Sequence, residues 1–531
     1  MGIPKGKTMK TEIFSTTEQD INRAGKIIAA GGLVAFPTET VYGLGADALN
    51  DEAVKNIYLA KGRPSDNPLI VHICKKEDIT PLVKQVTPEA KAVMNAFFPG
   101  PITIILPKSK KVGNVVSGGL NTVAIRMPKN EIARRLIKAA GVPIAAPSAN
   151  TSGLPSPTKA KYVIDDMMGK IDGIIDGGDC EFGVESTVLT LATDTPTILR
   201  PGAITKEMLE KVLGRVDIAK AVTEGMKNNE IAASPGMKYK HYAPKAKVIM
   251  VKADGEKYSK FVNMQKNAFA LCFEEDEVNI PKITFGKEND DLSQAKELFD
   301  ALRQADEQGA HKVYARIPRK TGVGLAVYNR LIRAAAFRII DLEKPFFIGL
   351  TGQTGAGKGY IGKKLKDAGF NVLDTDIYAR KITEKNSFVF PKLQEVFGND
   401  IIENGELNRP LLARRAFSNK EKTKTLNSIM HPAIIELCKK DAEFPAVLDA
   451  PLLFECGANK LCTVVLAVTA DEKTRICRIM KRDGITAEQA KLRINAQKDE
   501  EFYKSHADFV INNNDGEDIE SQIQHFLKDT V

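Results

Sequence analysis

The sequence predicts an α/β protein of several domains, and three observations support this fold class. The chain has 531 residues, 43% of them apolar and 27% charged, which is ordinary for a globular protein and enough for about two to four domains. Short apolar runs with β character alternate with helical patterns. A stretch rich in Gly, Pro, Asn and Lys near residue 225 and a short segment at 341–345 separate three such regions.

The first region, residues 10–205, is expected to form a mixed α/β domain. Its apolar runs that favour strands are LVAF (33–36), PLIVHI (68–73), ITIIL (102–106), TVAIRM (122–127), VPIAA (142–146) and STVLTL (186–191). From 206 to 245 a short helical piece is followed by EGMKNNEIAASPGMKYKHYAPKAK, whose composition is typical of a long linker. Long linkers of compact proteins are often functional or mobile.

The second region, residues 246–340, is expected to form a small α/β domain of Rossmann-like type. AKVIMV (246–251), AFALCF (268–273) and KVYARIP (312–318) favour strands, and 293–308 has the pattern of an amphipathic helix. DLEKP (341–345) is a junction to the third region, 346–531. The strand candidates there are FFIGL (346–350), NVLD (371–374), AVLDAP (446–451), TVVLAV (463–468) and DFVIN (508–512), separated by helical stretches as in a doubly wound parallel sheet.

Composition narrows the class of protein. The net charge of +9 suits anionic ligands such as nucleotides, but it is too dispersed to indicate nucleic-acid binding, and no stable DNA binding is expected. No apolar run reaches the roughly 18 residues of a membrane helix, and the N-terminus has no apolar core of a signal peptide. The seven cysteines include no CxxC pair, which favours reduced thiols in a cytoplasmic protein and no protein-held metal cluster.

A Gly-rich turn opens the third region. It follows an apolar strand and precedes a helical pattern, which is the context of a phosphate-binding loop, with Lys358 reaching the β- and γ-phosphates. Gly359 stands where such loops normally carry the Ser or Thr that contacts Mg²⁺, so we expect weakened metal binding at a working ATP site. The expected ATP contacts are Gly352, Gln353, Thr354, Gly355, Ala356, Gly357, Lys358 and Gly359.

Two acids end the next strand of this region. Asp374 and Asp376 are placed to orient or deprotonate an acceptor hydroxyl, although Asp374 is equally suited to cap the following helix. Asp376 is therefore the preferred residue for the acceptor. Further along, 475–497 carries Arg478, Arg482 and Arg493 on two helix-like pieces around a DG turn. They are either phosphate clamps or a solvated basic face.

Residues 346–531 resemble the dephospho-coenzyme A kinase family over their whole length. GLTGQTGAGK, DTDIYAR, GELNR, HPAI, APLLFE and ADFVINN occur in the family's order. The resemblance implies ATP- and Mg²⁺-dependent phosphorylation of the ribose 3′-hydroxyl of dephospho-CoA, with Asp376, Lys358 and Arg482 as catalytic residues and 475–497 as a lid. It implies an acceptor cleft of Arg409, His431, Pro451, Leu452 and Glu455. Asn408 stands where the family has Asp, which puts the role of an acid there in doubt.

Hydroxyl- and cation-rich turns follow strands of the first region. In FPTETVYGLG (36–45), Thr38 and Thr40 suit a small polar ligand or a helix cap. In KGRPSDNPLIVH (61–72), Lys61 and Arg63 form a candidate phosphate site, whereas His72 lies in an apolar strand and is equally suited to the core. APSANTSGLPSPT (146–158), ESTV (185–188) and LRPGAI (199–204) add further hydroxyls and one arginine, which suit phosphate or ribose oxygens.

Together with PGPIT, AIRMP and SPGMKYKHYAP, these motifs resemble a long-form, YrdC-like L-threonylcarbamoyladenylate synthase over about 10–340. The resemblance implies condensation of L-threonine, bicarbonate and ATP to threonylcarbamoyl-AMP and pyrophosphate. It implies threonine contacts from Thr40, His72, Arg126 and Ser186. It implies ATP contacts from Lys61, Arg63, Asn67, Thr122, Ser148, Ser156, Arg200 and Tyr242. It also places KYKHYAP over the pocket as a lid, so deleting 225–245 is expected to lower the yield of the intermediate.

The sequence thus predicts a bifunctional enzyme: the synthase fused to the kinase. Its substrates would be L-threonine, bicarbonate, ATP and dephospho-CoA, and a tRNA-modification transferase complex would use the intermediate downstream. Two alternatives remain. In the first alternative, the N-terminal half is an RNA-binding module and not a synthase, although it shows no aromatic stacking ladder. In the second, the last third is a nucleoside monophosphate kinase, or a scaffold inactivated at Gly359 and Asn408.

Overall fold

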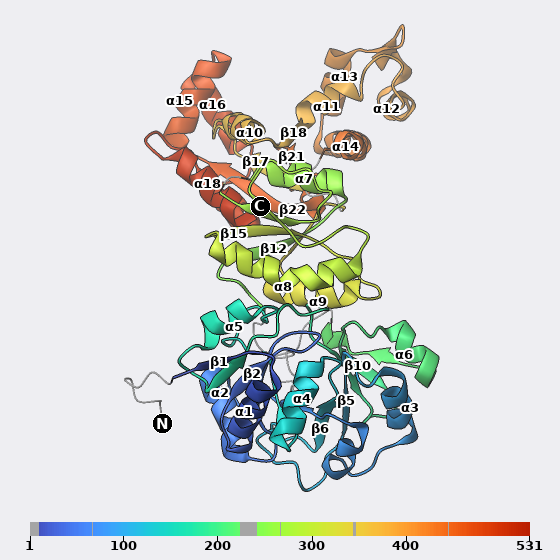
Figure 1. The fold of residues 1–531 in the computed structure, drawn as a ribbon. Helices are drawn as coiled ribbons and strands as arrows, with labels where there is room; N and C mark the ends of the chain where they lie inside the picture. The colour runs from blue at the N-terminus through green and yellow to red at the C-terminus, as the bar shows by residue number, and fades with distance from the viewer. Residues whose placement is uncertain are drawn as a thin grey trace. The chain divides into compact units, whose positions relative to one another are not determined.

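The computed structural model describes residues 10–65, 67–222, 242–265, 267–343, 347–443 and 445–530. The chain forms two compact units, Met1–Ile340 and Asp341–Val531 (Figure 1). Both units are α/β, as the sequence predicts. Among the described residues, no helix combines the length and apolar character needed to cross a bilayer.

Within its described residues, the first unit contains an eleven-stranded mixed sheet in the order β1-β8-β2-β3-β7-β4-β6-β5-β9-β10-β11. Its strands are β1 (Glu12–Phe14), β2 (Val34–Phe36), β3 (Gly43–Asp47), β4 (Ile70–His72), β5 (Ile102–Pro107), β6 (Thr122–Arg126), β7 (Ile144–Ala145), β8 (Gly173–Ile175), β9 (Thr187–Thr190), β10 (Thr197–Arg200) and β11 (Asp217–Ile218). Every apolar run predicted as a strand in 10–205 contains one. The segment 43–47, read as part of a polar turn, forms β3.

Helices cover this sheet. They are α1 (Glu18–Ala29), α2 (Asp51–Lys61), α3 (Pro88–Phe97), α4 (Glu131–Ala140), α5 (Ala160–Met167) and α6 (Lys206–Leu213), with short 3-10 turns η1 (Lys76–Leu82) and η2 (Lys220–Val222). Helices α1 and α4 lie side by side (Figure 1). Side-chain caps set the helix starts: Thr17 caps α1, Asn50 caps α2 and Asn130 caps α4.

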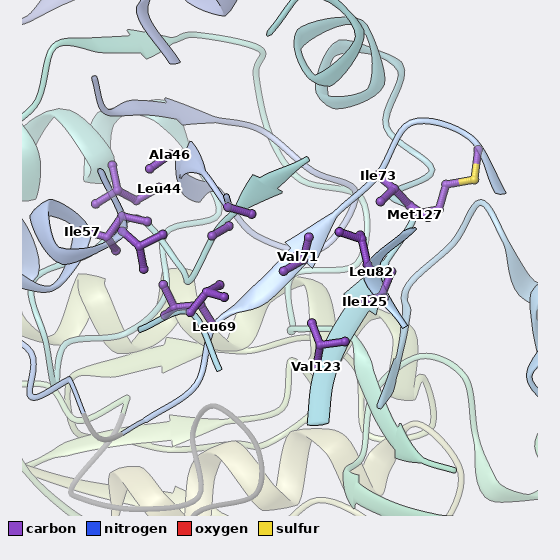
Figure 2. Packing of buried hydrophobic residues seen from close by; sticks show 14 of the residues in the cluster. Leu44, Ala46, Ile57, Leu69, Val71, Ile73, Leu82, Val123, Ile125 and Met127 are labelled. Carbon is purple, nitrogen blue, oxygen red and sulfur yellow. The ribbon is translucent and has the colours of Figure 1, made fainter. Parts of the chain in front are cut away.

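The two faces of the sheet are buried differently. In β4 and β6, Val71 and Ile125 are paired in register and belong to the largest apolar cluster (Figure 2). Their neighbours Ile70 and Ala124 point to the opposite face and belong to another, small cluster. Because side chains alternate along a strand, His72 and Arg126 share the face of Ile70 and Ala124. The large core therefore leaves these two polar side chains on the other side of the sheet.

The first unit also contains a smaller, five-stranded sheet in the order β14-β13-β15-β12-β16. Its elements are β12 (Lys247–Lys252), α7 (Gly255–Asn263), β13 (Phe269–Cys272), β14 (Lys282–Thr284), α8 (Asp291–Glu307), β15 (Lys312–Arg316), α9 (Gly324–Ala334) and β16 (Ile339–Asp341). The strands and the helix predicted for 246–340 fall on β12, β13, β15 and α8. Strand β16 extends into the segment expected to be a junction.

The short helical piece predicted at the start of the segment 206–245 is α6. It is followed by β11 and η2, which were not predicted, and β11 pairs parallel with β10. Thr205 caps α6, and Leu209 of this helix is fully buried. The cap and the buried leucine explain why residues 206–213 are helical. Residues 223–241, which include most of the KYKHYAP motif, lie outside the described residues.

The second unit is built on a five-stranded sheet in the order β18-β21-β17-β22-β23, and all of its pairings are parallel. The strands β17 (Phe347–Gly352), β18 (Asn371–Asp374), β21 (Ala446–Asp449), β22 (Cys462–Thr469) and β23 (Phe509–Asn512) correspond to the predicted strands. The doubly wound prediction is confirmed. In such a sheet, ligands bind beyond the carboxyl ends of the strands.

Helices connect these strands. They are α10 (Lys358–Asp367), α11 (Thr375–Lys381), α12 (Phe390–Phe397), α13 (Arg409–Ala416), α14 (Lys420–Asp441), α15 (Glu472–Asp483), α16 (Ala487–Asn495), α17 (Glu500–His506) and α18 (Ile519–Thr530). A small hairpin of β19 (Ile402–Glu403) and β20 (Glu406–Leu407) precedes α13. The central strand β17 leads directly into the Gly-rich turn and α10.

Candidate active sites

A pocket lies in the first unit, on the polar face of β4 and β6. Some of the residues that line it were named as candidate site residues from the sequence, and others were not. Its lining consists of Thr38, Val41, Gly43, Arg63, Ile70, His72, Arg126, Ala146, Pro147, Ser148, Glu185, Arg200 and Tyr242.

Strand register brings the predicted threonine-binding residues together. His72 of β4 and Arg126 of β6 are directly paired, and Arg126 is also opposite Thr103 of β5. The Thr103 hydroxyl lies 2.8 Å from that of Ser186. Thr40 is fully buried, and its hydroxyl lies 2.9 Å from that of Thr38 in the pocket wall. All four predicted residues therefore lie in or next to one polar cluster.

Arg126 is held by a buried carboxylate. Its Nη2 donates to Glu39 Oε1 at 2.7 Å, and the two side chains are only 5% and 2% exposed. Burial alone would raise the pKa of Glu39, but the charge and hydrogen bond of Arg126 outweigh it, so the pKa is lowered and the pair is ionic. The buried Nε of Arg126 has no hydrogen-bond partner among the described residues. Arg126 also lines the pocket, and a guanidinium there suits a ligand carboxylate.

His72 is neutral in this environment. Burial, together with the neighbouring Arg126 charge, lowers the pKa of His72 to about 3. Its Nδ1 lies 3.1 Å from the carbonyl oxygen of Ile70, so Nδ1 carries the proton and donates. The other ring nitrogen, Nε2, is therefore an acceptor. A neutral imidazole can accept a hydrogen bond from a ligand hydroxyl or amine without adding charge.

The predicted phosphate-binding residues are divided between the pocket wall and its support. Arg63, Ser148, Arg200 and Tyr242 line the pocket. Lys61 lies behind it: Nζ donates to the carbonyls of Ser148 at 2.5 Å and Asn150 at 2.6 Å. Burial, and then the Arg63 charge, hold the pKa of Lys61 well below its usual value. Lys61 thus fixes the 148–150 loop in this structure.

The remaining predicted ATP residues lie outside the pocket lining. Asn67 is 1% exposed, and neither polar atom of its side chain has a partner among the described residues. Ser156 donates to Glu185 at 2.6 Å and so supports a lining residue. Thr122 begins β6, at the opposite end of the strand from Arg126. The structure therefore does not bring Thr122 into this pocket.

An arginine of the small sheet region supports Glu185, one of the residues that line the pocket. Arg330 of α9 is fully buried and donates from Nε to Glu185 Oε2 at 2.9 Å and from Nη2 to the Glu185 carbonyl at 3.1 Å. Arg200 holds the next residue, donating from Nε to the Ser186 carbonyl at 3.1 Å and from Nη2 to its hydroxyl at 3.2 Å. Sequence reasoning did not single out Glu185 or Arg330, and it took Glu39 only as part of a polar turn. Glu39 and Glu185 lie within the hydroxyl-rich motifs FPTETVYGLG and ESTV, and this position was the only sequence feature that could have identified them.

In the second unit, the Gly-rich turn is shaped and held by its surroundings. Gly355 and Gly357 have φ values of 79° and 92°, a region that favours glycine. A Cβ at Gly357 would lie 2.1 Å from Asn513 Nδ2, which donates to the Ala356 carbonyl at 2.7 Å. Arg475, which the sequence analysis did not single out, donates to the Thr354 carbonyl at 3.0 Å. The turn ends at Gly357, and α10 begins at Lys358.

Lys358 is paired with an acid that sequence reasoning also missed. Its Nζ contacts the carboxylate of Asp449 at the end of β21. Asp449 is 5% exposed, and burial raises its pKa, although the Lys358 charge opposes this change. The segment AVLDAP was interpreted only as a strand end. Nothing in its local pattern distinguishes Asp449 from a helix- or turn-capping acid.

The two acids after β18 have different positions. Asp374 caps α11 by accepting the backbone N–H of Asp376 at 2.9 Å. Asp376 lies in the first turn of α11, and its side chain is exposed. The capping alternative considered for Asp374 therefore applies, and Asp376 is the acid that faces solvent after the carboxyl end of β18.

The predicted acceptor residues are only partly gathered. An open groove runs between α14 and residues 455–461, lined in part by His431 and Glu455. Burial lowers the pKa of His431. Arg409 at the start of α13, Pro451 and Leu452 do not line this groove. Asn408 caps α13 by accepting the N–H of Leu411 at 3.1 Å, a role that Asn fills as well as Asp does.

The three lid arginines differ in their distance from the phosphate-binding turn. Arg482 and Arg493 are 59% and 53% exposed, and both pair with Asp483. Arg478 instead donates from Nη1 to the Asn513 carbonyl at 2.9 Å, and this Nη1 lies 3.7 Å from the Cβ position of Gly357. In this structure Arg478 is the closer of the predicted arginines to the turn, and Arg482 is engaged elsewhere.

Comparisons with known proteins match both units. A family model described as "Telomere recombination" (Sua5, YciO and YrdC) matches residues 26–202, and the "Threonylcarbamoyl-AMP synthase, C-terminal domain" model matches 204–336. The "Dephospho-CoA kinase" model matches residues 346–518. The matched ranges lie within the first and second units, respectively.

Relatives and solved structures agree with these matches. Threonylcarbamoyl-AMP synthase of Pyrococcus abyssi is 47% identical over 334 residues, covering 61% of this chain and 96% of the relative. Dephospho-CoA kinase of Fusobacterium nucleatum is 40% identical over 187 residues, covering 34% of this chain and 96% of the relative. The crystal structure of P. abyssi Sua5 complexed with L-threonine matches with a TM-score of 0.59 at 45% identity, covering 62% of this chain and all of that one (100%). The chain is therefore an enzyme that belongs to the threonylcarbamoyl-AMP synthase family through its first unit and to the dephospho-CoA kinase family through its second.

Proposed function

We propose that the first unit condenses L-threonine, bicarbonate and ATP into threonylcarbamoyl-AMP and pyrophosphate. The observation that carries this proposal is the in-register pair of neutral His72 and charged Arg126 in a pocket that is also lined by Arg63, Ser148 and Arg200. His72 and Arg126 suit an amino-acid hydroxyl and carboxylate, and the two arginines and the serine suit phosphates. The P. abyssi relative that binds L-threonine supports the choice of amino acid.

The chemistry needs no side-chain nucleophile. The threonine amine and bicarbonate form a carbamate with loss of water, the carbamate oxygen attacks the α-phosphorus of ATP, and pyrophosphate leaves. Arg126 would bind the threonine carboxylate, with Thr40, His72 and Ser186 around the rest of the molecule. Arg63, Arg200 and Ser148 would bind the nucleotide, supported by Lys61, Asn67 and Ser156. The protein aligns the reactants, offsets charge and excludes water from a hydrolysable anhydride.

We propose that the second unit transfers the γ-phosphoryl group of ATP to the 3′-hydroxyl of dephospho-CoA. Lys358 would bind the β- and γ-phosphates, and Asp376 would accept the proton of the attacking hydroxyl. Arg482 would leave Asp483 to neutralise the transferring group when the lid closes. His431 and Glu455 would bind the acceptor in the groove beside α14, with Arg409, Pro451 and Leu452 joining the cleft. Mg²⁺, when bound, would reduce the charge of the ATP phosphates, and Asp449 beside Lys358 is the carboxylate that could hold it.

The wider setting follows from these activities. The proposed domains are a synthase domain at 10–205, a linker and lid at 206–245, a small C-terminal domain of the synthase at 246–340, and a kinase at 346–531. Threonylcarbamoyl-AMP would be consumed by a transferase complex that modifies tRNA, in the cytoplasm. Nothing in these contacts couples the two reactions, which cleave ATP at different bonds.

The test is ATP turnover by the full chain, with ADP resolved from pyrophosphate. Threonine- and bicarbonate-dependent pyrophosphate together with dephospho-CoA-dependent ADP and CoA would support both activities. Pyrophosphate without ADP would mean that the second unit is a scaffold or takes another acceptor, which nucleoside monophosphates would reveal. Salt-dependent tRNA binding without pyrophosphate release would favour an RNA-binding first unit.

A further inference from the structure

The first unit has a second hollow, which lies away from the candidate synthase pocket and shares no lining residue with it. Gly43, the first residue of β3, and Ala146, directly after β7, line the synthase pocket. Leu49, after β3, and Pro143, directly before β7, line the second hollow. Because β3 and β7 pair antiparallel, the two hollows lie at opposite ends of this strand pair. We call the second hollow the α4 groove, since α4 forms one of its walls and η1 with residues 74–75 forms another.

Positive side chains dominate the polar lining of the α4 groove. The lining has two acids, Asp78 and Glu131, and its cations are Lys75, Lys111, Arg134, Arg135 and Lys138. Asp78 is already engaged by the protein, because it accepts the backbone N–H of Lys75 at 3.2 Å and its other oxygen lies 3.8 Å from Lys75 Nζ. The groove therefore has an excess of positive charge that its own acids do not offset.

Three of these cations are left without partners by the protein. Within the described part of the chain, the side chains of Lys111, Arg134 and Lys138 make no ion pair and no hydrogen bond. Arg134 is partly buried, and its Nε is fully buried without an acceptor among the described residues. A buried donor without an acceptor is costly, so the guanidinium of Arg134 is a group that the folded chain itself does not satisfy.

Helix stability does not account for this cluster. Arg134 and Lys138 are four residues apart on α4, a spacing at which like charges repel. Lys138 lies in the last turn of the helix, where the helix dipole favours a cation. Arg134 lies in the middle of the helix and has no such benefit. A bound anion would offset the repulsion and supply the missing acceptor.

The rest of the groove is apolar. Its floor and sides include Leu49, Pro81, Leu82, Ile137 and Val142. Leu49 is 46% exposed, which is unusual for a leucine beside a hollow of this kind. An inorganic anion would contact the cations and leave this apolar surface uncovered. Small-molecule sites commonly combine an apolar lining with a few polar groups that fix the orientation of the ligand.

We propose that the α4 groove is a second ligand site, which binds an organic phosphate of nucleotide size. Its phosphates would contact Arg134, Lys138 and Lys111, because clustered Arg and Lys side chains suit phosphate oxygens. Its uncharged body would cover Leu49 and the neighbouring apolar side chains. This site takes no part in the proposed synthase or kinase chemistry, and the inference does not depend on either activity.

The experiment is photo-cross-linking of the full chain with 8-azido-ADP, followed by mass spectrometry of its peptides. Peptide mapping separates label in the groove from label at the two candidate active sites. We expect saturable label in 74–82 or 131–143 that unlabelled ADP displaces and inorganic pyrophosphate displaces at least about 10-fold less well, because pyrophosphate has no body to cover the apolar floor. 2-Azido-ADP, which carries its azide on another edge of the base, repeats the mapping.

Variants make the test specific to the groove. Arg134→Gln combined with Lys138→Gln should weaken ADP displacement of the groove label by about 10-fold or more. Label at the other nucleotide sites should be unchanged. Lys111→Gln, which lies on a separate exposed loop, should weaken it by about 3-fold even if the double variant folds poorly. The matched control is Lys91→Gln combined with Lys211→Gln, which removes two exposed cations outside the groove and should have no effect. Circular dichroism and thermal melting check the fold of each chain.

Several results would overturn the inference. An absence of groove label with both azido nucleotides, or label that excess ADP does not displace, would mean that the groove is not a nucleotide-sized site. Equal displacement by pyrophosphate and ADP would reduce it to a site for inorganic phosphates. Displacement by tRNA at far lower concentrations than by ADP would assign the cations to a nucleic-acid surface. Unchanged label in both the double variant and Lys111→Gln would show that these cations bind no phosphate.

Discussion

The two candidate sites differ in how far their functional side chains are buried. In the first unit, Thr40, His72, Arg126 and Ser186 are all 4% exposed or less. In the second unit, Asp376 is exposed, and the Arg482 side chain is 59% exposed. The first site is therefore largely formed before its substrates bind. The second must bring separate groups together when nucleotide and acceptor arrive.

This difference in burial is related to how the charged side chains of each site are paired. Buried charges require partners, and the first pocket supplies them within the protein, through Glu39 for Arg126 and Arg330 for Glu185. Only the Lys358–Asp449 pair is comparably buried among the kinase residues discussed. Function and stability should therefore be linked in the first site and largely separable in the second. The predictions below test that contrast.

The largest effect is expected from breaking the buried pair in the synthase pocket. Arg126→Gln removes the proposed carboxylate ligand and leaves Glu39 charged and buried without its partner. We expect threonine-dependent pyrophosphate release to fall by more than about 100-fold, because a charge-assisted contact to substrate is lost. The free energy of unfolding of the first unit should fall by about 3–5 kcal/mol. Pyrophosphate release and denaturant unfolding measure the two effects.

The control is an exposed ion pair in the same unit. Lys129 and Glu181 are each 54% exposed and lie 3.1 Å apart, so Lys129→Gln should change the free energy of unfolding by less than about 1 kcal/mol. ADP formation by the second unit should be unaffected in both variants. A folded Arg126→Gln chain with near-normal affinity for threonine would show that another residue binds the carboxylate.

A second prediction separates function from stability in the kinase site. Asp376→Asn removes the proposed acceptor base and should lower dephospho-CoA-dependent ADP formation by about 100-fold or more. Because Asp376 is exposed, the free energy of unfolding should change by less than about 0.5 kcal/mol. Steady-state kinetics and thermal melting give the two quantities. Asp374→Asn keeps the helix cap, so it should retain most activity. Equal losses in both variants would contradict the choice of Asp376.

The buried contacts behind this contrast also explain what the sequence could and could not predict. Strong apolar runs predicted strands such as β5, β6 and β18 correctly. Strand β3 was missed because GLGAD is built from small residues in a segment that reads as a turn. Hydroxyl-rich motifs identified the pocket loops. Their supports were missed because the partners are distant in the chain: Glu39 and Arg126 are 87 residues apart, and Glu185 and Arg330 are 145 apart.

A third, smaller effect concerns the lid arginines. If Arg482 leaves Asp483 for the transferring phosphoryl group, Arg482→Gln should lower kcat for CoA formation by about 10-fold with little change in the affinity for ATP. Arg493→Gln, which alters the same exposed cluster around Asp483, is the matched control and should have a smaller effect. Single-turnover phosphoryl transfer and nucleotide titration measure the two quantities. Normal kcat in Arg482→Gln together with a loss in Arg478→Gln would assign the role to Arg478, which already lies beside the phosphate-binding turn.

The smallest effect is a pH dependence of stability that arises from burying His72. The pKa of His72 is lowered to about 3 in the folded first unit, whereas the pKa of a histidine in the unfolded chain lies near its ordinary value of about 6.5. Between these values the unfolded state binds a proton that the folded state does not, so the free energy of unfolding falls as pH decreases below 6.5. Above 6.5 both states are neutral, and His72 contributes no pH dependence to the free energy of unfolding.

From pH 7.5 to 5.5 the free energy of unfolding should fall by about 1 kcal/mol because of His72. His72→Gln replaces the imidazole with a polar amide that cannot titrate, so the stability of this variant should fall less over the same interval, by about that amount. Urea unfolding of the first unit at both pH values measures the difference, and other titrating groups cancel because both chains share them. Equal losses in the two chains would mean that His72 takes up a proton in the folded pocket, which would also place a second positive charge beside Arg126.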